Sequence, residues 1–348
     1  MRMKPLSAVG AVLLTATLML GACSSTPGPA PSVDTSSWDA VVSAAEQEGQ
    51  VTLYAPIPPA KIEALLAAFN KEYPGIKADY FRDTSGPLTA RVDQEIEASA
   101  LGADVVWTNE IFWNKKQADD GLLLPVTGPA SDAWKDNDVT NLDAGLVNIL
   151  NDPIVIVYNT DLVTTPPVDW DSLLDSEYAG AVGVIEVQST GMVTWYKYLE
   201  DTQGSDFLPA LAKQKPQIYP SLVPMAQAVA AGEIKVGAFN FGWVAGNLKD
   251  QNAPIDYVIP ESGTTVIQHQ AMAYKQARHP NAGLVLLDFL MSEEAQEIAA
   301  GNQESYSQLD IKNNMAVDPS KLTASVPEDA ESATVDRIRS LVNELFVR

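Results

Sequence analysis

The feature that most constrains the fold of this chain is a regular alternation between short β-rich runs and stretches with helical periodicity. Apolar residues recur at three- and four-residue spacing, typical of one helix face, over 62–69 and again over 84–96. Three β-rich runs flank these stretches, at residues 51–54, 76–81 and 103–107. The resulting β-α-β-α-β order is typical of a parallel sheet covered by helices.

The same alternation returns in the second half of the chain. β-rich runs at 183–187 and 235–241 alternate with helical periodicity at 189–199, 222–229 and 243–250. The sequence therefore predicts two α/β units in one chain, although no sequence repeat relates them.

Two stretches are predicted to run between these units. The first, 146–159, contains a strand at 153–158, and the second, 255–274, contains strands at 256–259 and 265–267. Two open α/β lobes joined by two strands form a cleft that opens and closes. We therefore expect an α/β protein with two lobes and mixed, mainly parallel sheets.

The expected boundaries of the lobes follow from these crossings. Residues 38–150 together with 265–348 are predicted to form the first lobe, and residues 151–264 the second. A last helix face at 335–345 is expected to pack back on the first lobe.

The N-terminal residues have the composition of a secretion signal. Arg2 and Lys4 precede an uncharged apolar run that ends in Leu-Gly-Ala before Cys23. This resembles the bacterial lipobox, which implies that residues 1–22 are removed and that Cys23 is lipidated at the membrane. An ordinary secretory signal with a chance cysteine and a plain membrane anchor are the alternatives. Residues 23–37 are rich in Ser, Pro and Thr and are predicted to be an extended tether.

Charge and cysteine content exclude several classes of function. The chain has 22 Lys and Arg against 45 Asp and Glu, a formal net charge of −23. Loss of Arg2 and Lys4 with the signal would change this from −23 to −25. So acidic a chain is not expected to bind nucleic acid. A single cysteine excludes an internal disulfide and a thiolate-rich metal site.

Several short segments then point to a known family by their order and spacing. They lie at 48–54, 67–76, 103–107, 121–125, 155–159, 170–174, 189–191, 279–282 and 287–296. On these segments the chain resembles solute-binding lipoproteins of ABC importers. It is similar to the type 2 periplasmic-binding fold, in the branch with ferric-iron, thiamine, aminoethylphosphonate and polyamine binders. The resemblance implies an extracytoplasmic monomer that binds a small polar solute without a cofactor, and whose partners are a membrane permease and its ATPase.

The sequence differs from the iron binders of this branch at the positions where those proteins bind their metal. The paired tyrosines of those proteins are replaced here by the sequence from Asn240 to Trp243. The expected histidine falls near Pro56 and Ile57, the expected acidic ligand at Asn109, and a basic residue near Asp152. Ferric iron needs hard anionic oxygen ligands. These departures argue against iron, and a metal-binding member of the branch stays as the alternative.

The ligand is expected beyond the carboxyl ends of the strands, where open parallel sheets bind their ligands. Two of the loops there, before the helices at 84 and 189, carry Ser and Thr, which either hold an anionic group or simply cap the helix. Acidic residues outnumber Arg82 in these loops, so an amine-bearing or zwitterionic solute is expected. The candidate ligand-binding residues are Pro56, Ile57, Thr84, Ser85, Asn109, Glu110, Asp152, Gln188, Ser189, Thr190, Gly191, Asn240, Phe241 and Trp243.

No catalytic motif is evident in the sequence. There is no G-x-S-x-G elbow, phosphate-binding loop or H-E-x-x-H motif. His269 and His279, the two histidines of the chain, have no nucleophile at a recognisable spacing. We therefore expect a binding protein and no catalytic residues, with a secreted hydrolase or a sensor lipoprotein as the alternatives.

Overall fold

The structure is a computed structural model, and it describes residues 33, 36–134, 136, 140–187, 190–324 and 332–347. The chain divides into two units, residues 1–30 and 31–348, and the description below concerns the second. The predicted signal, Cys23 and most of the tether lie outside the described residues. Within the described part of the chain, no helix combines the length and the apolar character needed to cross a membrane.

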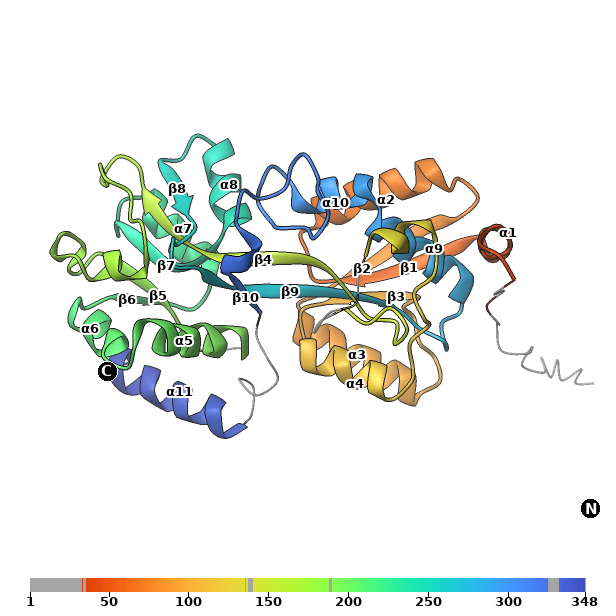
Figure 1. Ribbon diagram of the computed structural model, residues 1–348, viewed down its shortest axis with the longest axis horizontal. Helices are drawn as coiled ribbons and strands as arrows, with labels where there is room; N and C mark the ends of the chain where they lie inside the picture. Colours follow the sequence, from red (N-terminus) through yellow and green to blue (C-terminus); the bar gives the residue numbers. More distant parts are fainter. Residues whose placement is uncertain are drawn as a thin grey trace, which may run out of the picture. The chain divides into compact units, whose positions relative to one another are not determined.

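The first lobe is built as its sequence alternation predicts (Figure 1). The central strand β1 pairs in parallel with β2 on one side and β3 on the other. Helices α2 and α3 connect these strands, which confirms the expected α/β class. The bounds are β1 Gln50–Ala55, α2 Pro59–Glu72, β2 Lys77–Arg82, α3 Ser85–Glu97 and β3 Val105–Thr108.

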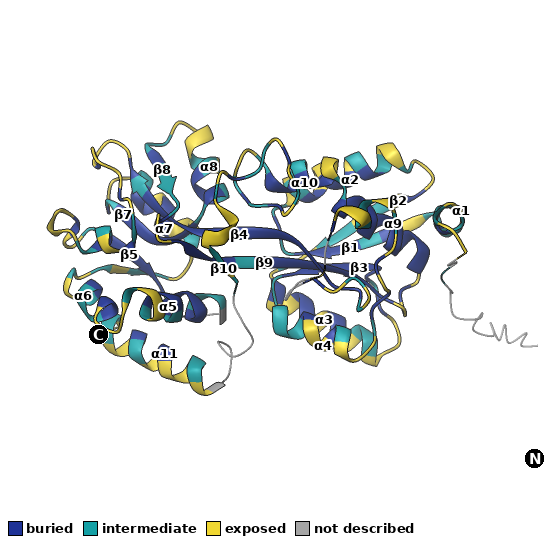
Figure 2. Ribbon diagram, in the orientation of Figure 1, coloured by how far each residue is buried: buried dark blue, intermediate teal, exposed yellow. Residues whose placement is uncertain are grey.

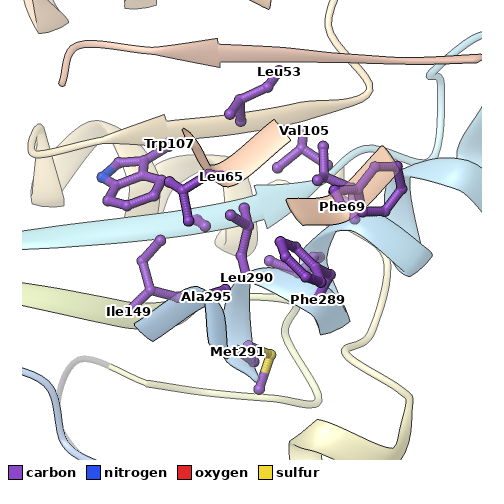
Figure 3. Close-up of a cluster of buried hydrophobic side chains, with 14 of the residues drawn as sticks. Leu53, Leu65, Phe69, Val105, Trp107, Ile149, Phe289, Leu290, Met291 and Ala295 are labelled. Atoms are coloured by element: carbon purple, nitrogen blue, oxygen red, sulfur yellow. The ribbon is translucent and has the colours of Figure 1, made fainter. Parts of the chain in front are cut away.

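Both faces of this sheet are buried, so successive strand residues enter different cores. Leu53, Val105 and Trp107 lie in a layer with α2, α9 and α10, as Figure 3 shows. Tyr54 and Val106 point to the opposite face, into a smaller core with α3. The helices that complete this lobe are α1 Trp38–Glu48, α4 Ile111–Asp119, α9 Pro280–Met291 and α10 Glu293–Ala300.

The second lobe repeats this arrangement of strands. Its central strand β5 pairs in parallel with β6 and β7. The strand order β6-β5-β7-β4 therefore matches the order β2-β1-β3-β9 of the first lobe. The bounds are β5 Val182–Ile185, α5 Thr190–Gln203, α6 Phe207–Lys213, β6 Gln217–Tyr219, α7 Leu222–Ala230, β7 Val236–Phe241, α8 Gly242–Asp250 and β8 Ile255–Val258.

Two long antiparallel strands, β4 Val147–Asn159 and β9 Thr264–Ala273, run between the lobes. The first half of β4 pairs with β9, and its second half pairs with β7 and β8. Both strands are buried along most of their length (Figure 2). They are longer than the sequence pattern predicts because polar residues such as Asn151 and Gln268 interrupt the apolar runs.

The C-terminal helix corrects one expected lobe boundary. Residues 280–300 pack on the first lobe as α9 and α10, but α11 Ser332–Phe346 packs against α5 and α6 of the second lobe. Its Ile338 and Val342 are buried in the second core. The assignment of the last helix to the first lobe is therefore wrong, because its apolar face completes the outer layer over α5. The remaining elements are β10 Leu322–Ala324 and short 3-10 helices at Pro129–Ala133, Trp170–Leu174, Ser176–Tyr178 and Pro319–Lys321.

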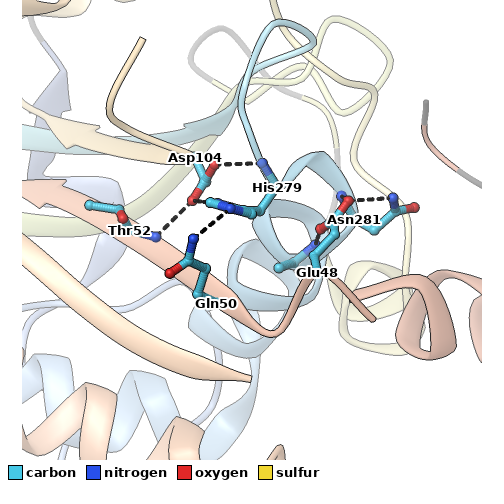
Figure 4. Close-up of polar contacts among 7 residues, drawn as sticks. Glu48, Gln50, Thr52, Asp104, His279 and Asn281 are labelled. Atoms are coloured by element: carbon cyan, nitrogen blue, oxygen red, sulfur yellow. Dashed lines mark hydrogen bonds and ion pairs between the residues drawn. The ribbon is translucent and has the colours of Figure 1, made fainter. Parts of the chain in front are cut away.

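Two carboxylates fix the N-terminal end of α9, one to the sheet of the first lobe and one to the end of α1 (Figure 4). Asp104 accepts from the backbone N–H groups of Thr52 at 2.8 Å and His279 at 2.9 Å, and lies 3.0 Å from Nδ1 of His279. Glu48 accepts from the backbone N–H of Ala282 at 2.8 Å. Both carboxylates also meet the positive end of the helix dipole. His279 thus has a structural role at this helix end.

A third carboxyl of this lobe, Asp288 of α9, makes stability depend on pH. Burial raises the pKa of Asp288 to about 6, although the carboxyl accepts from the backbone N–H of Ala130 at 2.9 Å. Because the folded pKa lies above the unfolded one, this group favours the folded state below about pH 4 and loses that contribution as the pH rises to about 6.

We therefore expect Asp288→Asn to stabilise the fold at neutral pH. The amide keeps an acceptor for Ala130 and carries no charge to bury. The full shift corresponds to about 3 kcal/mol, and nearby solvent reduces it, so the expected gain at pH 7.5 is about 1–2 kcal/mol. Urea unfolding at pH 4 and pH 7.5 measures it. An equal effect of the substitution at both pH values would contradict this account.

Candidate functional site

A cavity of about 370 Å³ lies between the two lobes. Residues of both lobes and of the crossover strand β9 form its walls. Those of the first lobe are Pro56, Thr84, Ser85, Gly86, Asn109, Glu110, Ile111 and Phe112. Those of the second lobe and of β9 are Gly191, Met192, Thr194, Leu222, Phe239, Phe241, Val266, Ile267 and Gln268.

The topology of the two sheets explains where the cavity lies. The wall residues follow the carboxyl ends of β1, β2 and β3 in the first lobe and of β5, β6 and β7 in the second. Pro56 comes directly after β1, for example, and Phe241 ends β7. Ligands of open parallel sheets bind at these strand ends. The six strand ends of the two lobes therefore converge on one site.

Most of the cavity wall is apolar, unlike the polar cleft that the sequence predicts. Phe112 on the first lobe is matched by Met192, Leu222, Phe239 and Phe241 on the second. Among the described residues that line the cavity, none is a lysine, an arginine, a histidine or a tyrosine, and Glu110 is the single carboxylate. The site is suited to a ligand with an apolar body and few polar groups.

Two buried polar atoms at this cavity have no hydrogen-bond partner among the described residues. They are Oγ of Ser85, whose residue is 7% exposed, and Oε1 of Gln268, whose residue is 3% exposed. Leaving such an atom unsatisfied costs about 1–3 kcal/mol. Both atoms belong to residues of the cavity wall, one at the start of α3 and the other on β9. A ligand that supplies the missing partners recovers this free energy.

The carboxyl of Glu110 also has no counter-charge among the described residues. Burial raises its pKa above the ordinary value, and no neighbouring charge contributes to the shift. Glu110 stands between β3 and α4, where its backbone N–H donates to Oγ1 of Thr108 at 3.1 Å. Its position on the wall is thus fixed by the strand end, and its charge is left for a ligand to neutralise.

Several helices begin at the cavity without a side-chain cap. In α3, α4 and α7 the cap residues Thr84, Glu110 and Ser221 make no capping hydrogen bond from their side chains. Unpaired N–H groups of a first turn carry about half a positive charge. The polar atoms of a ligand therefore meet hydrogen-bond donors on the wall as well as Glu110.

Half of the residues predicted to bind ligand stand on the cavity wall. These are Pro56, Thr84, Ser85, Asn109, Glu110, Gly191 and Phe241. Gln188, Ser189 and the side chain of Thr190 lie outside the described residues, so their predicted role stays a prediction.

Four predicted residues are placed elsewhere and need correction. Ile57 is buried in the core of the first lobe, because the chain after β1 turns inward toward α2. Asn240 is fully buried on β7, and it donates to the carbonyl of Leu222 at 3.0 Å and accepts from the N–H of Phe241 at 2.9 Å. Trp243 packs on Phe241 in the second lobe, with ring centres 6.2 Å apart. Asn240 and Trp243 thus position cavity residues without lining the cavity.

The fourth, Asp152, belongs to a buried network between the crossover strands. Its Oδ2 atom lies 3.1 Å from Nε2 of His269, and its Oδ1 atom accepts from the hydroxyl of Ser305 at 2.5 Å. The indole N–H of Trp107 donates to Nδ1 of His269 at 3.1 Å, so Nε2 carries the proton that His269 donates to Asp152. Burial alone would raise the pKa of Asp152, but the hydrogen bonds from His269 and Ser305 outweigh it and lower that pKa.

Several wall residues have no clear signal in the sequence. Phe112, Met192 and Phe239 are apolar residues that sequence reasoning assigns to a core as readily as to a site. Gln268 is missed because the strand is expected to end at 267, although a polar residue inside a buried strand is itself a signal. Gly86 follows Thr84 and Ser85 in the loop predicted to precede the helix, but it has no side chain with a donor.

The described residues contain no cluster of three or more His, Cys, Asp or Glu side chains suited to hold a metal ion. Glu110 has no second carboxylate, histidine or tyrosine beside it among the described wall residues. The described part of the cavity thus offers one hard anionic ligand, which is fewer than a ferric site requires.

Comparison with known proteins gives a family match over most of the chain. Residues 54–297 match the model of the family described as bacterial extracellular solute-binding protein. An uncharacterised protein of Haemophilus influenzae is 25% identical over 311 residues, covering 81% of this chain and 86% of that protein.

Solved structures of similar fold include three from other bacteria. A substrate-binding protein of an ABC transporter from Agrobacterium tumefaciens has a TM-score of 0.71 at 18% identity, covering 85% of this chain and 94% of that one. Iron-bound HitA from Pseudomonas aeruginosa has a TM-score of 0.67 at 20% identity, covering 85% and 99%. AfuA from Actinobacillus pleuropneumoniae, with fructose 6-phosphate bound, has a TM-score of 0.62 at 20% identity, covering 86% and 99%. At these identities the likeness shows the two-lobed fold.

Proposed function

The chain belongs to the bacterial extracellular solute-binding proteins, and from that premise we propose that it is the substrate-binding component of an ABC importer. In this proposal it captures a small solute in the cavity between its lobes and delivers it to a membrane permease that an ATPase drives. The observation that carries the proposal is the interlobe cavity itself, where two buried polar atoms lack partners.

The hinge geometry supports a binding protein that closes on its ligand. The two lobes have separate hydrophobic cores, and β4 and β9 run from one lobe to the other. Two lobes on such a connection close around a ligand in a hinge motion. A bound solute contacts both cavity walls at once, and so favours the closed form.

The cavity chemistry favours an organic solute over the two ligands named for the structural neighbours. HitA was solved with iron and AfuA with a sugar phosphate. Here the described wall residues supply one carboxylate and no tyrosine for a ferric ion, and no lysine or arginine for a phosphate dianion. Ferric iron stays as the alternative ligand, and a titration with ferric citrate tests it.

The proposed site of action is the extracytoplasmic face of the cell membrane, in the periplasm or at the cell surface. Cleavage before Cys23 and lipidation of its thiol would hold the domain there as a monomer on the tether 23–37. Two or three acyl chains contribute about 0.8 kcal/mol per buried methylene, which is enough for durable anchoring. Intact mass spectrometry of the membrane fraction, compared with a Cys23→Ala variant, tests this. A parent protein in the membrane fraction whose Cys23 carries no acyl chains would contradict lipid anchoring.

A solute-binding protein also differs from a secreted hydrolase or a sensor in what happens to its ligand. We expect a solute found by a thermal-shift screen to be recovered unchanged by NMR. Small-angle scattering is expected to show a smaller radius of gyration with the solute than without it, because closure brings the lobes together. Conversion of the solute would favour the hydrolase. Binding without compaction, in a cell whose permease does not respond to the protein, would favour the sensor.

A further inference from the structure

The cavity wall carries polar groups without partners, and together they are complementary to one class of ligand. Glu110 presents a partly desolvated carboxylate with no described basic partner. Gln268 presents a buried amide oxygen that accepts no hydrogen bond. Both groups are acceptors, and both line the same cavity. A ligand must therefore bring hydrogen-bond donors, and a positive charge offsets the cost of burying the carboxylate.

An ammonium group meets both requirements. It carries one positive charge to neutralise Glu110 and three N–H donors, enough to serve both Glu110 and Gln268. A neutral hydroxyl has a single donor and no charge. A carboxylate or phosphate brings acceptors only, and Glu110 repels it. Among the described side chains of the wall, the single formal charge thus favours a cation.

The other residues of the cavity wall indicate the chemistry of the rest of the ligand. Phe112, Phe239, Phe241 and Leu222 offer apolar and aromatic surface, which gains free energy by covering an apolar ligand body. Oγ of Ser85 stands at the start of α3, a helix without a side-chain cap, and has no partner. A ligand oxygen near Ser85 would accept from this hydroxyl and from the first turn of the helix.

From these groups we propose that the solute is a small amine on an apolar body, with its ammonium group held by Glu110 and Gln268. This inference rests on the proposed function, because it assigns the solute class of the same cavity. It makes Glu110 and Gln268 the residues that determine specificity and Ser85 a secondary contact.

Two matched pairs of probes test the ammonium requirement. Phenethylamine is compared with 2-phenylethanol, and phenylalanine with 3-phenylpropionate, by calorimetric titration of the mature protein. In at least one pair the ammonium-bearing member is expected to bind at least tenfold tighter than its partner. Fructose 6-phosphate and ferric citrate complete the panel as an anionic and a metal probe.

Three variants assign the effect to the cavity residues. Glu110→Gln is expected to remove the tenfold advantage, and Gln268→Leu to reduce it. Ser85→Ala is expected to weaken binding about three- to tenfold, as for one lost hydrogen bond. Glu261→Gln, on an exposed carboxylate away from the cavity, is the matched control and is expected to bind like the parent. Thermal unfolding of each variant shows whether it is folded.

Different results would contradict the inference and the proposed function. Equal binding within both pairs, or an advantage that survives Glu110→Gln, would overturn the inference. So would tight binding of fructose 6-phosphate or ferric citrate when the four aromatic probes do not bind, although the proposed function would stand. If no probe binds and no solute is recovered with the purified protein, both fail.

Discussion

Replacing Gly86 by Trp is expected to abolish solute binding while the protein stays folded. Gly86 lines the cavity at the start of α3, and a Cβ atom added there meets nothing within 4 Å. The indole ring would therefore extend into the space that the solute occupies, without displacing the wall. We expect the affinity to fall at least about 100-fold, or about 2.8 kcal/mol.

Gln94→Trp is the matched control for this substitution. It adds the same ring to an exposed position of the same helix, outside the cavity wall. We expect Gln94→Trp to bind the solute like the parent, and both variants to unfold within a few degrees of it. An unchanged affinity of Gly86→Trp would show that the solute binds elsewhere.

Replacing Asp152 by Ala is expected to destabilise the fold strongly. It leaves the buried N–H of His269 and the buried hydroxyl of Ser305 without their acceptor. Each unsatisfied group costs about 1–3 kcal/mol, and breaking a buried pair typically costs about 3–5 kcal/mol. We therefore expect a loss of about 3 kcal/mol or more, measured by urea unfolding at neutral pH.

The Asn variant at the same position separates hydrogen bonding from charge. The amide oxygen of Asp152→Asn can still accept from His269, and Ser305 can accept from the amide nitrogen instead of donating. We expect the free energy of unfolding to fall in Asp152→Asn by less than half as much as it falls in Asp152→Ala. Equal losses in the two variants would show that the negative charge, rather than the hydrogen bonds, stabilises the crossover strands.

Most of the fold follows from local patterns in the sequence. The alternation of β-rich runs and helical periodicity predicts β1 to β3 with α2 and α3, and β5 and β7 with α5 and α7. Strand β6, at Gln217–Tyr219, is too short to show any periodicity. The apolar face of α11 is visible in the sequence, but the lobe that it covers is decided by tertiary contacts with α5 and α6.

The crossover strands show why a hinge is harder to predict than a lobe. Their buried polar residues break the apolar pattern on which strand prediction relies. In the fold these residues satisfy one another across strands, as Asp152 and His269 do. Such pairings join residues 117 positions apart, and no local pattern contains that information.

The sequence predicts the position of the candidate site better than it predicts the polarity of its walls. The rule that ligands sit at strand carboxyl ends finds the loops of Ser85, Asn109 and Glu110, which do line the cavity. The apolar nature of the opposite wall depends on which face of α5, α7 and β7 turns inward. That orientation follows from packing over the whole second lobe, so the sequence pattern alone suggested a more polar cleft.

Native mass spectrometry of the gently purified protein tests the central claim most directly. The parent is expected to carry a small molecule of defined mass in a one-to-one complex. The same preparation of Gly86→Trp is expected to carry none, and Gln94→Trp to carry it like the parent. A solute mass retained by Gly86→Trp at the parental level would contradict capture in the cavity between the lobes.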